Sequence, residues 1–243
     1  MKRKFEVDFT NQIKAQKLDD LKYTGTPEKF LKTSRSNFKY MDIDIEPLLD
    51  TPPPANSSER TKQELLEVKS FMEKDHPEEF KSQLKKMDED PAKFIIDSYK
   101  ELSGEVFTSK PKNVPKEALK FIKGGDVEVL AMKLKMHYAR PRPYQIAKYY
   151  GIELNYNKKI QHGDADAPSY PSGHTLAAYF AARVIGYIDP MYANELEEKA
   201  KMVADSRIAE GVHFKSDNNF SFALVDKAMM KAFVKAYEKG RDT

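Results

Sequence analysis

Cysteine is missing from the 243-residue chain, which excludes disulfide bonds, thiolate metal sites and a cysteine nucleophile. Long apolar runs are missing as well. The most apolar stretch, Leu176–Ile188, is interrupted by Arg183 and is too short to cross a bilayer, so we do not expect an integral membrane protein. Strand signals are almost absent, because no alternating run of apolar and polar residues is bounded by hairpin turns. The sequence therefore predicts an all-α protein, a single-domain helical bundle.

Net charge is also small: 41 basic and 38 acidic residues leave +3. That balance gives no support to binding of nucleic acid or of a membrane surface. The first residues, Met1–Asp8, include basic side chains but no apolar run follows them, so no signal peptide is predicted. With 40% hydrophobic and 33% charged residues we expect a soluble globular protein. It would be cytoplasmic as the chain is written, and periplasmic or secreted if a leader was removed.

The chain divides into a polar N-terminal extension, residues 1–45, and a domain over residues 46–243. The extension has weak periodicity and is expected to wrap on the domain. Consecutive prolines at Pro52–Pro54 predict an extended segment, which ends at Ser57 or Ser58, good N-caps for a helix. Proline and capping signals predict helices that begin near Glu59, Pro77, Pro91, Pro115, Val127, Gly173, Tyr192 and Phe220.

The segment Ser206–Asp217 contains the parts of a nucleophilic site. If it is helical, His213 and Asp217 lie one turn apart on the same face. The carboxylate can then accept the proton of one ring nitrogen and leave a lone pair on the other. Arg207, two turns before His213, supplies a permanent cation for an anionic ligand. The segment is equally compatible with an ordinary amphipathic helix that carries a surface His–Asp pair.

A basic segment, Lys133–Pro143, offers two cation pairs. Lys135 and Arg142 are seven residues apart, about two helical turns, and Lys133 and Arg140 have the same spacing, so spacing alone does not choose between the pairs. Proline disfavours helix for the residue before it, so the chain is expected to leave the helix near Arg140. The alternative is a solvated basic helix end that the helix dipole favours.

Pro168–Thr175 precedes the small-residue helix Leu176–Ile188. Ser172, Gly173 and His174 at a helix start bring a hydroxyl, free backbone amides and an imidazole to one point, which suits an anion. Simple capping by Ser172, with His174 as a bystander, explains the same residues. The three segments together contain what a phosphoryl-transfer site needs, because they combine two histidines, several cations and a helix N-terminus.

The three segments also follow a known signature, with the order Lys135-x6-Arg142-Pro143, Pro171-Ser172-Gly173-His174 and Ser206-Arg207-x5-His213-x3-Asp217. This order and its internal spacings resemble the type 2 phosphatidic acid phosphatase (PAP2) superfamily, which includes bacterial class A acid phosphatases and vanadium haloperoxidases. The segment Pro52–Ser58 is similar to the proline-rich segment before the first core helix of the class A enzymes. The resemblance covers about residues 46–240 and implies the all-α fold of the acid phosphatase/vanadium-dependent haloperoxidase type.

The resemblance implies a metal-independent acid phosphatase that hydrolyses small phosphomonoesters and can also transfer phosphate to alcohols. His213 would form a phosphohistidine, Asp217 would orient it, and His174 would protonate the leaving oxygen and later activate water. The phosphoryl oxygens would be held by Lys135, Arg142, Ser172, Gly173 and Arg207. Arg142 is thereby favoured over Arg140. No cofactor or metal is expected, although vanadate or phosphate can occupy such a site, and a homodimer is a further expectation.

Two residues depart from the class A pattern: Phe214 follows His213 where tryptophan is usual, and Glu210 lies in a stretch that is usually small. An acidic optimum is expected, because His174 acts protonated whereas His213 must be neutral to attack. A vanadium haloperoxidase, with vanadate on His213, and a catalytically idle binding protein are the alternatives. A His/Asp metallohydrolase is a fourth hypothesis, but the sequence lacks the extra carboxylates near His174 and His213 that such a metal site needs. Of the other histidines, His162 is the best candidate to touch substrate.

Overall fold

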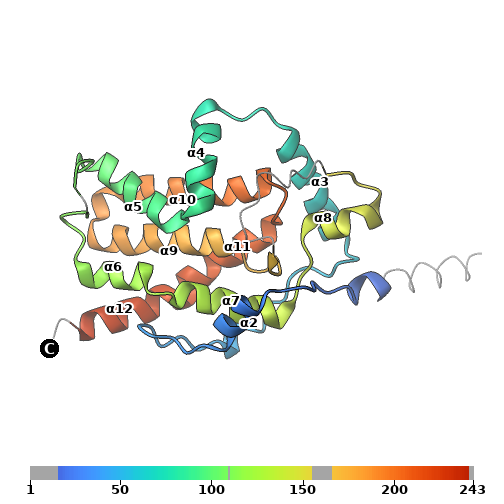
Figure 1. Cartoon of the computed structure of the whole chain (residues 1–243), viewed down its shortest axis with the longest axis horizontal. Helices are drawn as coiled ribbons and strands as arrows, with labels where there is room; N and C mark the ends of the chain where they lie inside the picture. The colour runs from blue at the N-terminus through green and yellow to red at the C-terminus, as the bar shows by residue number, and fades with distance from the viewer. Residues whose placement is uncertain (1–15, 109, 155–165, 241–243) are drawn as a thin grey trace, which may run out of the picture.

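The computed structural model of the protein describes residues 16–108, 110–154 and 166–240 (Figure 1). These residues form helices, short 3-10 turns and loops, and no strand occurs among them, which confirms the predicted all-α class. The α-helices are α2 (Glu28–Arg35), α3 (Glu59–Glu73), α4 (Glu78–Glu89), α5 (Pro91–Leu102), α6 (Lys116–Lys123), α7 (Asp126–Tyr138), α8 (Pro143–Ile146), α9 (Gly173–Ile188), α10 (Ala193–Ala209), α11 (Lys215–Leu224) and α12 (Met230–Lys239). A π-helical turn, Val225–Met229, connects α11 to α12.

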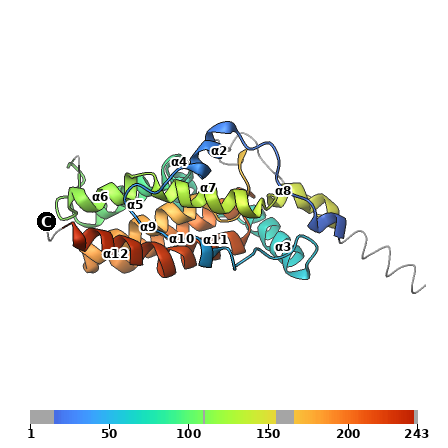
Figure 2. The same cartoon turned by 90° about the horizontal axis from the view of Figure 1, so that it is seen from below.

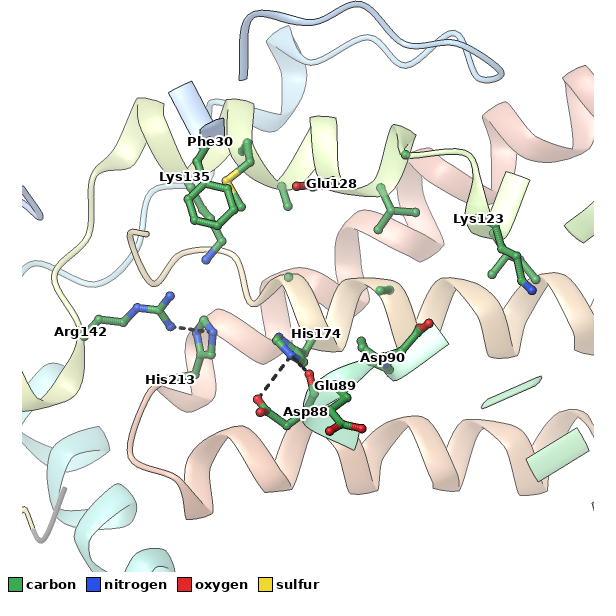
Figure 3. Close-up of a pocket in the computed structure, with 18 residues that line it drawn as sticks. Phe30, Asp88, Glu89, Asp90, Lys123, Glu128, Lys135, Arg142, His174 and His213 are labelled. Atoms are coloured by element: carbon green, nitrogen blue, oxygen red, sulfur yellow. Dashed lines mark hydrogen bonds and ion pairs between the residues drawn. The ribbon is translucent and has the colours of Figure 1, made fainter. Parts of the chain in front are cut away.

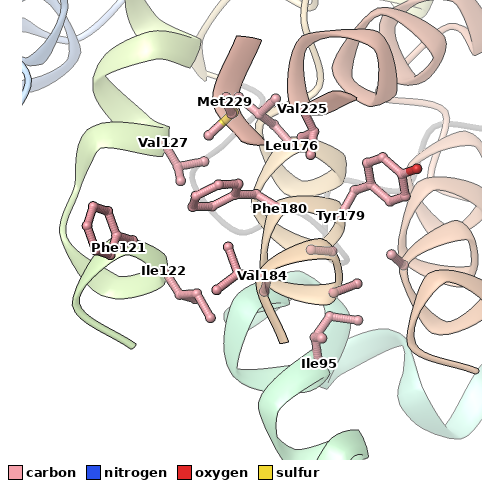
Figure 4. Packing of buried hydrophobic residues seen from close by; sticks show 14 of the residues in the cluster. Ile95, Phe121, Ile122, Val127, Leu176, Tyr179, Phe180, Val184, Val225 and Met229 are labelled. Atoms are coloured by element: carbon pink, nitrogen blue, oxygen red, sulfur yellow. The ribbon is translucent and has the colours of Figure 1, made fainter. Parts of the chain in front are cut away.

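The small-residue helix α9 is the centre of the bundle. It packs against α5, α7, α10 and α11, and both views show it between the α6–α7 side and the α10 side (Figures 1 and 2). Ala178, Ala181 and Ala182 are fully buried, so their short side chains let the neighbouring helices approach closely. Larger side chains of α9, including Phe180 and Val184, interdigitate with residues of α6, α7 and the π-helical turn (Figure 4). The candidate site residues at the start of α9, Ser172, Gly173 and His174, are therefore held by a tightly packed helix.

The proline and serine signals locate the helix starts well. Ser58 caps α3 by accepting the Thr61 N–H at 3.1 Å, and Asp90 caps α5 by accepting the Lys93 N–H at 2.8 Å. Pro77 and Pro115 are the N-caps of α4 and α6, and α9 begins at Gly173 as predicted. Fixed φ and missing N–H groups make these sites favourable helix entries.

The segment Ser206–Asp217 does not form one continuous helix. The helix α10 ends at Ala209, and Gly211 then adopts a φ of 69°, a left-handed conformation in which glycine is not strained. Phe214 is extended and α11 begins at Lys215, five residues earlier than Phe220, where the next helix was expected. His213 therefore lies in a turn between two helices and not one turn before Asp217 on a single helix.

The N-terminal segment from residue 16 to residue 45 is packed on the domain, with α2 on the outer side of α7 (Figure 2). The buried Asp126 carboxylate accepts three backbone N–H groups of this segment, from Lys39 at 2.7 Å and from Tyr40 and Met41 at 2.8 Å. Farther along, the Tyr23 N–H donates to the Ala139 carbonyl at 2.8 Å. The segment is thus attached at both ends of α7, while a domain boundary at residue 45 stays a prediction. None of the described helices is long and apolar enough to span a bilayer.

Candidate active site

His213 is fixed by the N-terminus of α11. The Asp217 carboxylate, in the first turn of this helix, accepts the Phe214 N–H at 2.9 Å, so it satisfies a free amide of the helix start. The same oxygen lies 3.0 Å from Nδ1 of His213. Because an ionised carboxylate only accepts hydrogen bonds, Nδ1 carries the proton and donates it. The predicted His–Asp pair is therefore present, although a helix cap and not helical spacing creates it.

A buried ionic network holds Asp217 from the opposite side. Arg140 donates from Nη1 to Asp217 at 2.6 Å and to the Ser216 hydroxyl at 2.8 Å. Its Nη2 lies 3.3 Å from Glu64 of α3, and Glu64 also accepts the Ser216 N–H at 3.0 Å. The Arg140 guanidinium stacks on the Phe214 ring at 3.9 Å, a favourable cation–π distance. Phe214 thus has a defined structural partner where class A enzymes usually have tryptophan.

This network sets the protonation of the pair. Burial alone would raise the pKa of Asp217, but the Arg140 charge and the hydrogen bond from His213 hold that pKa well below its usual range. For His213, burial and the nearby Arg142 charge lower the pKa well below the usual imidazole value, and they outweigh the opposing effect of Asp217. His213 is consequently neutral and Asp217 is ionised near neutral pH.

Arg142 contacts the second ring nitrogen of His213. Its Nη1 lies 2.9 Å from Nε2, and since a guanidinium only donates, Nε2 carries the lone pair. Arg142 is fully buried and is oriented by two backbone carbonyls, those of Ala167 and Val212, each at 2.8 Å. Of the two arginines that the spacing left equivalent, Arg142 lies on the His213 ring, whereas Arg140 lies behind Asp217.

His174 stands on the first turn of α9. Ser172 is the N-cap of this helix, and its hydroxyl accepts the Thr175 N–H at 3.4 Å and the Thr175 hydroxyl at 2.9 Å. The His174 Nε2 atom is 2.8 Å from the Asp88 carbonyl oxygen and 3.6 Å from a carboxylate oxygen of the same residue. Because a carbonyl oxygen only accepts hydrogen bonds, the Nε2 atom of His174 carries a proton and donates to the Asp88 carbonyl.

The two histidines open on one cavity of about 600 Å³ (Figure 3). At one end, Lys135 extends from α7 toward the Arg142–His213 pair, and its ammonium donates to the Pro168 carbonyl. Gly173 also lines the cavity, and a Cβ built on it would lie 4.0 Å from Lys135 Cε, so the helix start is accessible to a ligand here. Five of the eight predicted residues therefore border a single cavity: Lys135, Arg142, Gly173, His174 and His213.

The other three predicted residues lie behind this surface. Asp217 supports His213, and the Ser172 hydroxyl takes part in capping α9. Arg207 pairs through Nη1 with Asp88 at 2.5 Å and with Glu210 at 2.8 Å, and all three side chains are buried. Phosphate binding by Ser172 and Arg207, as by Lys135, Arg142 and Gly173, stays a prediction. Glu210, noted as a departure from the class A pattern, thus contacts a predicted phosphate ligand.

Sequence reasoning did not find Glu64, Asp88 or Phe30. Glu64 and Asp88 are ordinary acidic residues of amphipathic helices in sequence, and only the fold brings them to Arg140 and His174. Phe30, from the predicted extension, lines the cavity. His162 lies outside the described residues. In the part of the chain that the structure describes, no group of three or more His, Asp or Glu side chains is arranged to hold a metal ion.

Comparison with known proteins finds matches over the segment that contains this site. The sequence model of the PAP2 superfamily matches residues 127–225, a segment that contains all eight predicted residues. A non-specific acid phosphatase from Providencia stuartii is 32% identical to the chain over 93 residues. That alignment covers 38% of this chain and 35% of the relative, so the chain matches about a third of that enzyme's length. Over the segment that forms the site, the chain is thus similar to the PAP2 superfamily.

Proposed function

We propose that the protein hydrolyses phosphomonoesters through a covalent phosphohistidine on His213. One observation carries the proposal: a neutral imidazole, held by a carboxylate on Nδ1, places its Nε2 lone pair next to the buried Arg142, in a cavity that Lys135 and a second histidine also line. This is the arrangement of an activated nucleophile with its orienting acid and charge stabilisers. The match to the PAP2 superfamily over residues 127–225 and the similarity to an acid phosphatase support the same activity.

The phosphoryl group would bind at the end of the cavity formed by Lys135, Arg142 and the N-terminus of α9. Its oxygens would accept hydrogen bonds from the two cations and from free amides that begin at Gly173. Because Arg142 donates to Nε2 of His213 at 2.9 Å, the incoming anion must draw this donor away before attack. Arg207 and Ser172 would add further donors from behind.

In the first step, Nε2 of His213 attacks phosphorus, the N–P bond forms and the ester P–O bond breaks. The departing alkoxide takes a proton from His174, and the free alcohol leaves. The proton on Nδ1 stays shared with Asp217, which stabilises the positive charge that develops on the ring. Lys135 and Arg142 neutralise the charge on the equatorial oxygens, a role that metal ions have in other phosphoryl-transfer enzymes.

In the second step, His174, now neutral, removes a proton from a water molecule that attacks the phosphohistidine. The N–P bond breaks, phosphate leaves and His213 regains its lone pair. An alcohol in place of water would give phosphate transfer. Since His174 must begin the cycle protonated, the rate should be highest at acidic pH and should fall as pH rises.

The proposal is tested by assay on p-nitrophenyl phosphate from pH 4 to 8 in the presence of EDTA. His213→Ala should abolish turnover, whereas His137→Ala, at an exposed position of the same helix as Lys135, should leave it unchanged. A rapid alkaline quench should trap phosphohistidine in the wild type only. Loss of activity in EDTA would contradict the metal-independent reaction. Absence of turnover, with bromide oxidation after addition of vanadate and peroxide, would instead assign the cavity to a haloperoxidase.

A further inference from the structure

The cavity is much larger than a phosphoryl group requires. Its volume of about 600 Å³ lies in the range of roughly 300–1,000 Å³ that holds an organic ligand of drug size. The predicted phosphate ligands occupy only the end formed by Lys135, Arg142 and His213 (Figure 3). The rest of the cavity is therefore available for the leaving alcohol, and its walls determine which alcohols fit.

One face of α7 runs along the whole cavity. Val127, Ala131 and Lys135 are spaced four residues apart, so they share this face, and all three line the cavity. Eight residues separate the first from the last, which corresponds to about 12 Å at 1.5 Å per residue. Along the face that Val127, Ala131 and Lys135 share, the side chains change from an ammonium at the phosphate end to apolar groups at the other. Charged side chains line other parts of the cavity: Glu89, Asp90, Lys123 and Glu128 (Figure 3). On this face of α7, the leaving alcohol thus meets an apolar wall directly beyond the phosphoryl group.

Phe30 completes this wall from outside the segment that matches the PAP2 superfamily. It is the buried residue of α2 and packs against Met132 of α7 and against Ala167. The N-terminal segment is attached to α7 by the hydrogen bonds to Asp126 and Ala139, and in addition Lys133 donates to the Ser34 carbonyl at 3.1 Å. The position of the Phe30 ring is therefore fixed by several contacts.

We infer that Phe30 is a specificity-determining residue, and that the N-terminal segment adapts the site to phosphomonoesters whose alcohol has an apolar body of at least the size of an aromatic ring. This inference rests on the proposed phosphatase function. An aromatic ring packed on Phe30 and on the apolar face of α7 gains burial and ring–ring contact that a small polar alcohol cannot make. The N-terminal segment, which lies outside the residues matched by the family model, thereby acquires a function at the site.

The test compares phenyl phosphate with methyl phosphate in the wild type and in Phe30→Ala. We expect kcat/KM for phenyl phosphate to fall about tenfold, the value of one favourable aromatic contact, and that for methyl phosphate to change little. Intrinsic reactivity of the two esters cancels, because each variant is compared with the wild type on the same ester. Phe30→Leu, which keeps the apolar volume, should recover part of the loss, and Phe107→Ala, at a fully exposed ring, should have no effect.

Three readouts separate the possible outcomes. An unchanged inhibition constant for inorganic phosphate would show that the phosphate end is intact in Phe30→Ala. Loss of a buried ring lowers the melting temperature, so the fold is checked by a single cooperative melting transition above the assay temperature. An equal loss on both esters, or no loss on phenyl phosphate, would overturn the inference. If the wild type hydrolyses neither ester, the proposed function fails by itself. In that case calorimetric binding of benzylphosphonate still decides the inference, because Phe30→Ala must bind it more weakly than the wild type while binding phosphate equally.

Discussion

Arg140 offers the sharpest test of how the nucleophile is supported. It does not line the cavity, yet it joins Asp217 at 2.6 Å to Glu64 at 3.3 Å. In Arg140→Lys the charge remains, but a single ammonium cannot replace a planar fork that reaches both carboxylates and stacks on Phe214. Losing one charge-assisted hydrogen bond costs about 1.5–3 kcal/mol. If that loss falls on the orientation of His213, kcat should decrease by about 10- to 100-fold with little change in KM.

Arg140→Met is the stronger perturbation, because it leaves Asp217 and Glu64 as buried carboxylates without their cation. We expect it to lower the free energy of unfolding by about 3–5 kcal/mol. Turnover of p-nitrophenyl phosphate, urea unfolding and the ¹⁵N chemical shifts of His213 should be measured together, since only the shifts report which ring nitrogen carries the proton. Arg60→Lys, at an exposed partner of Glu64, is the matched control. A folded Arg140→Lys enzyme with an unchanged kcat, or with a raised KM alone, would refute the reasoning.

Three further predictions concern the surroundings of the nucleophile. The folded-state pKa of His213 lies below the ordinary 6.5, so below that pH the unfolded chain binds a proton that the folded protein does not. The free energy of unfolding should therefore fall by about 1.4 kcal/mol for each pH unit by which the pH is lowered. His213→Asn should flatten this dependence in urea unfolding between pH 7 and 5, and an unchanged slope would contradict it. Glu210→Gln removes one of two carboxylates from Arg207, so inorganic phosphate should inhibit at about tenfold lower concentration; equal inhibition would mean that Glu210 does not restrain Arg207. Gly211→Ala imposes a left-handed φ on alanine and brings its Cβ within 2.7 Å of the Met72 sulfur, so the urea midpoint should fall by the equivalent of about 1–2 kcal/mol, and a wild-type midpoint would argue against strain at this turn.

Local signals in the sequence were sufficient for much of the fold. Prolines and capping residues act within one helical turn, which is why the starts of α3, α4, α5, α6 and α9 could be predicted. The end of α10 could not, because Gly211 is compatible with a helix until the tertiary structure requires a turn. The His213–Asp217 pair was therefore expected for the wrong local reason, since its geometry comes from the cap of α11.

Within the site, motif spacing found the residues that border the cavity but not those that hold them. Three residues reach the site from distant parts of the sequence, so no local pattern encodes their positions. Glu64 of α3 contacts Arg140, and Asp88 of α4 contacts His174. Phe30 of α2 lines the cavity. Spacing left Arg140 and Arg142 equivalent. Their different partners, a carboxylate for one and the nucleophilic ring for the other, are a property of the packed structure.

The hydrogen bond from Arg142 to Nε2 of His213 also has a consequence for the choice between ester classes. In the proposed reaction, the Arg142 guanidinium blocks the Nε2 lone pair until a strongly negative ligand takes over its hydrogen bond. A carboxylic ester is neutral and offers nothing that competes for the donor, so His213 stays engaged and the ester is not attacked. A phosphomonoester is negatively charged and can compete for the Arg142 guanidinium. The hydrogen bond between Arg142 and His213 thus discriminates between phosphomonoesters and carboxylic esters before any covalent bond forms.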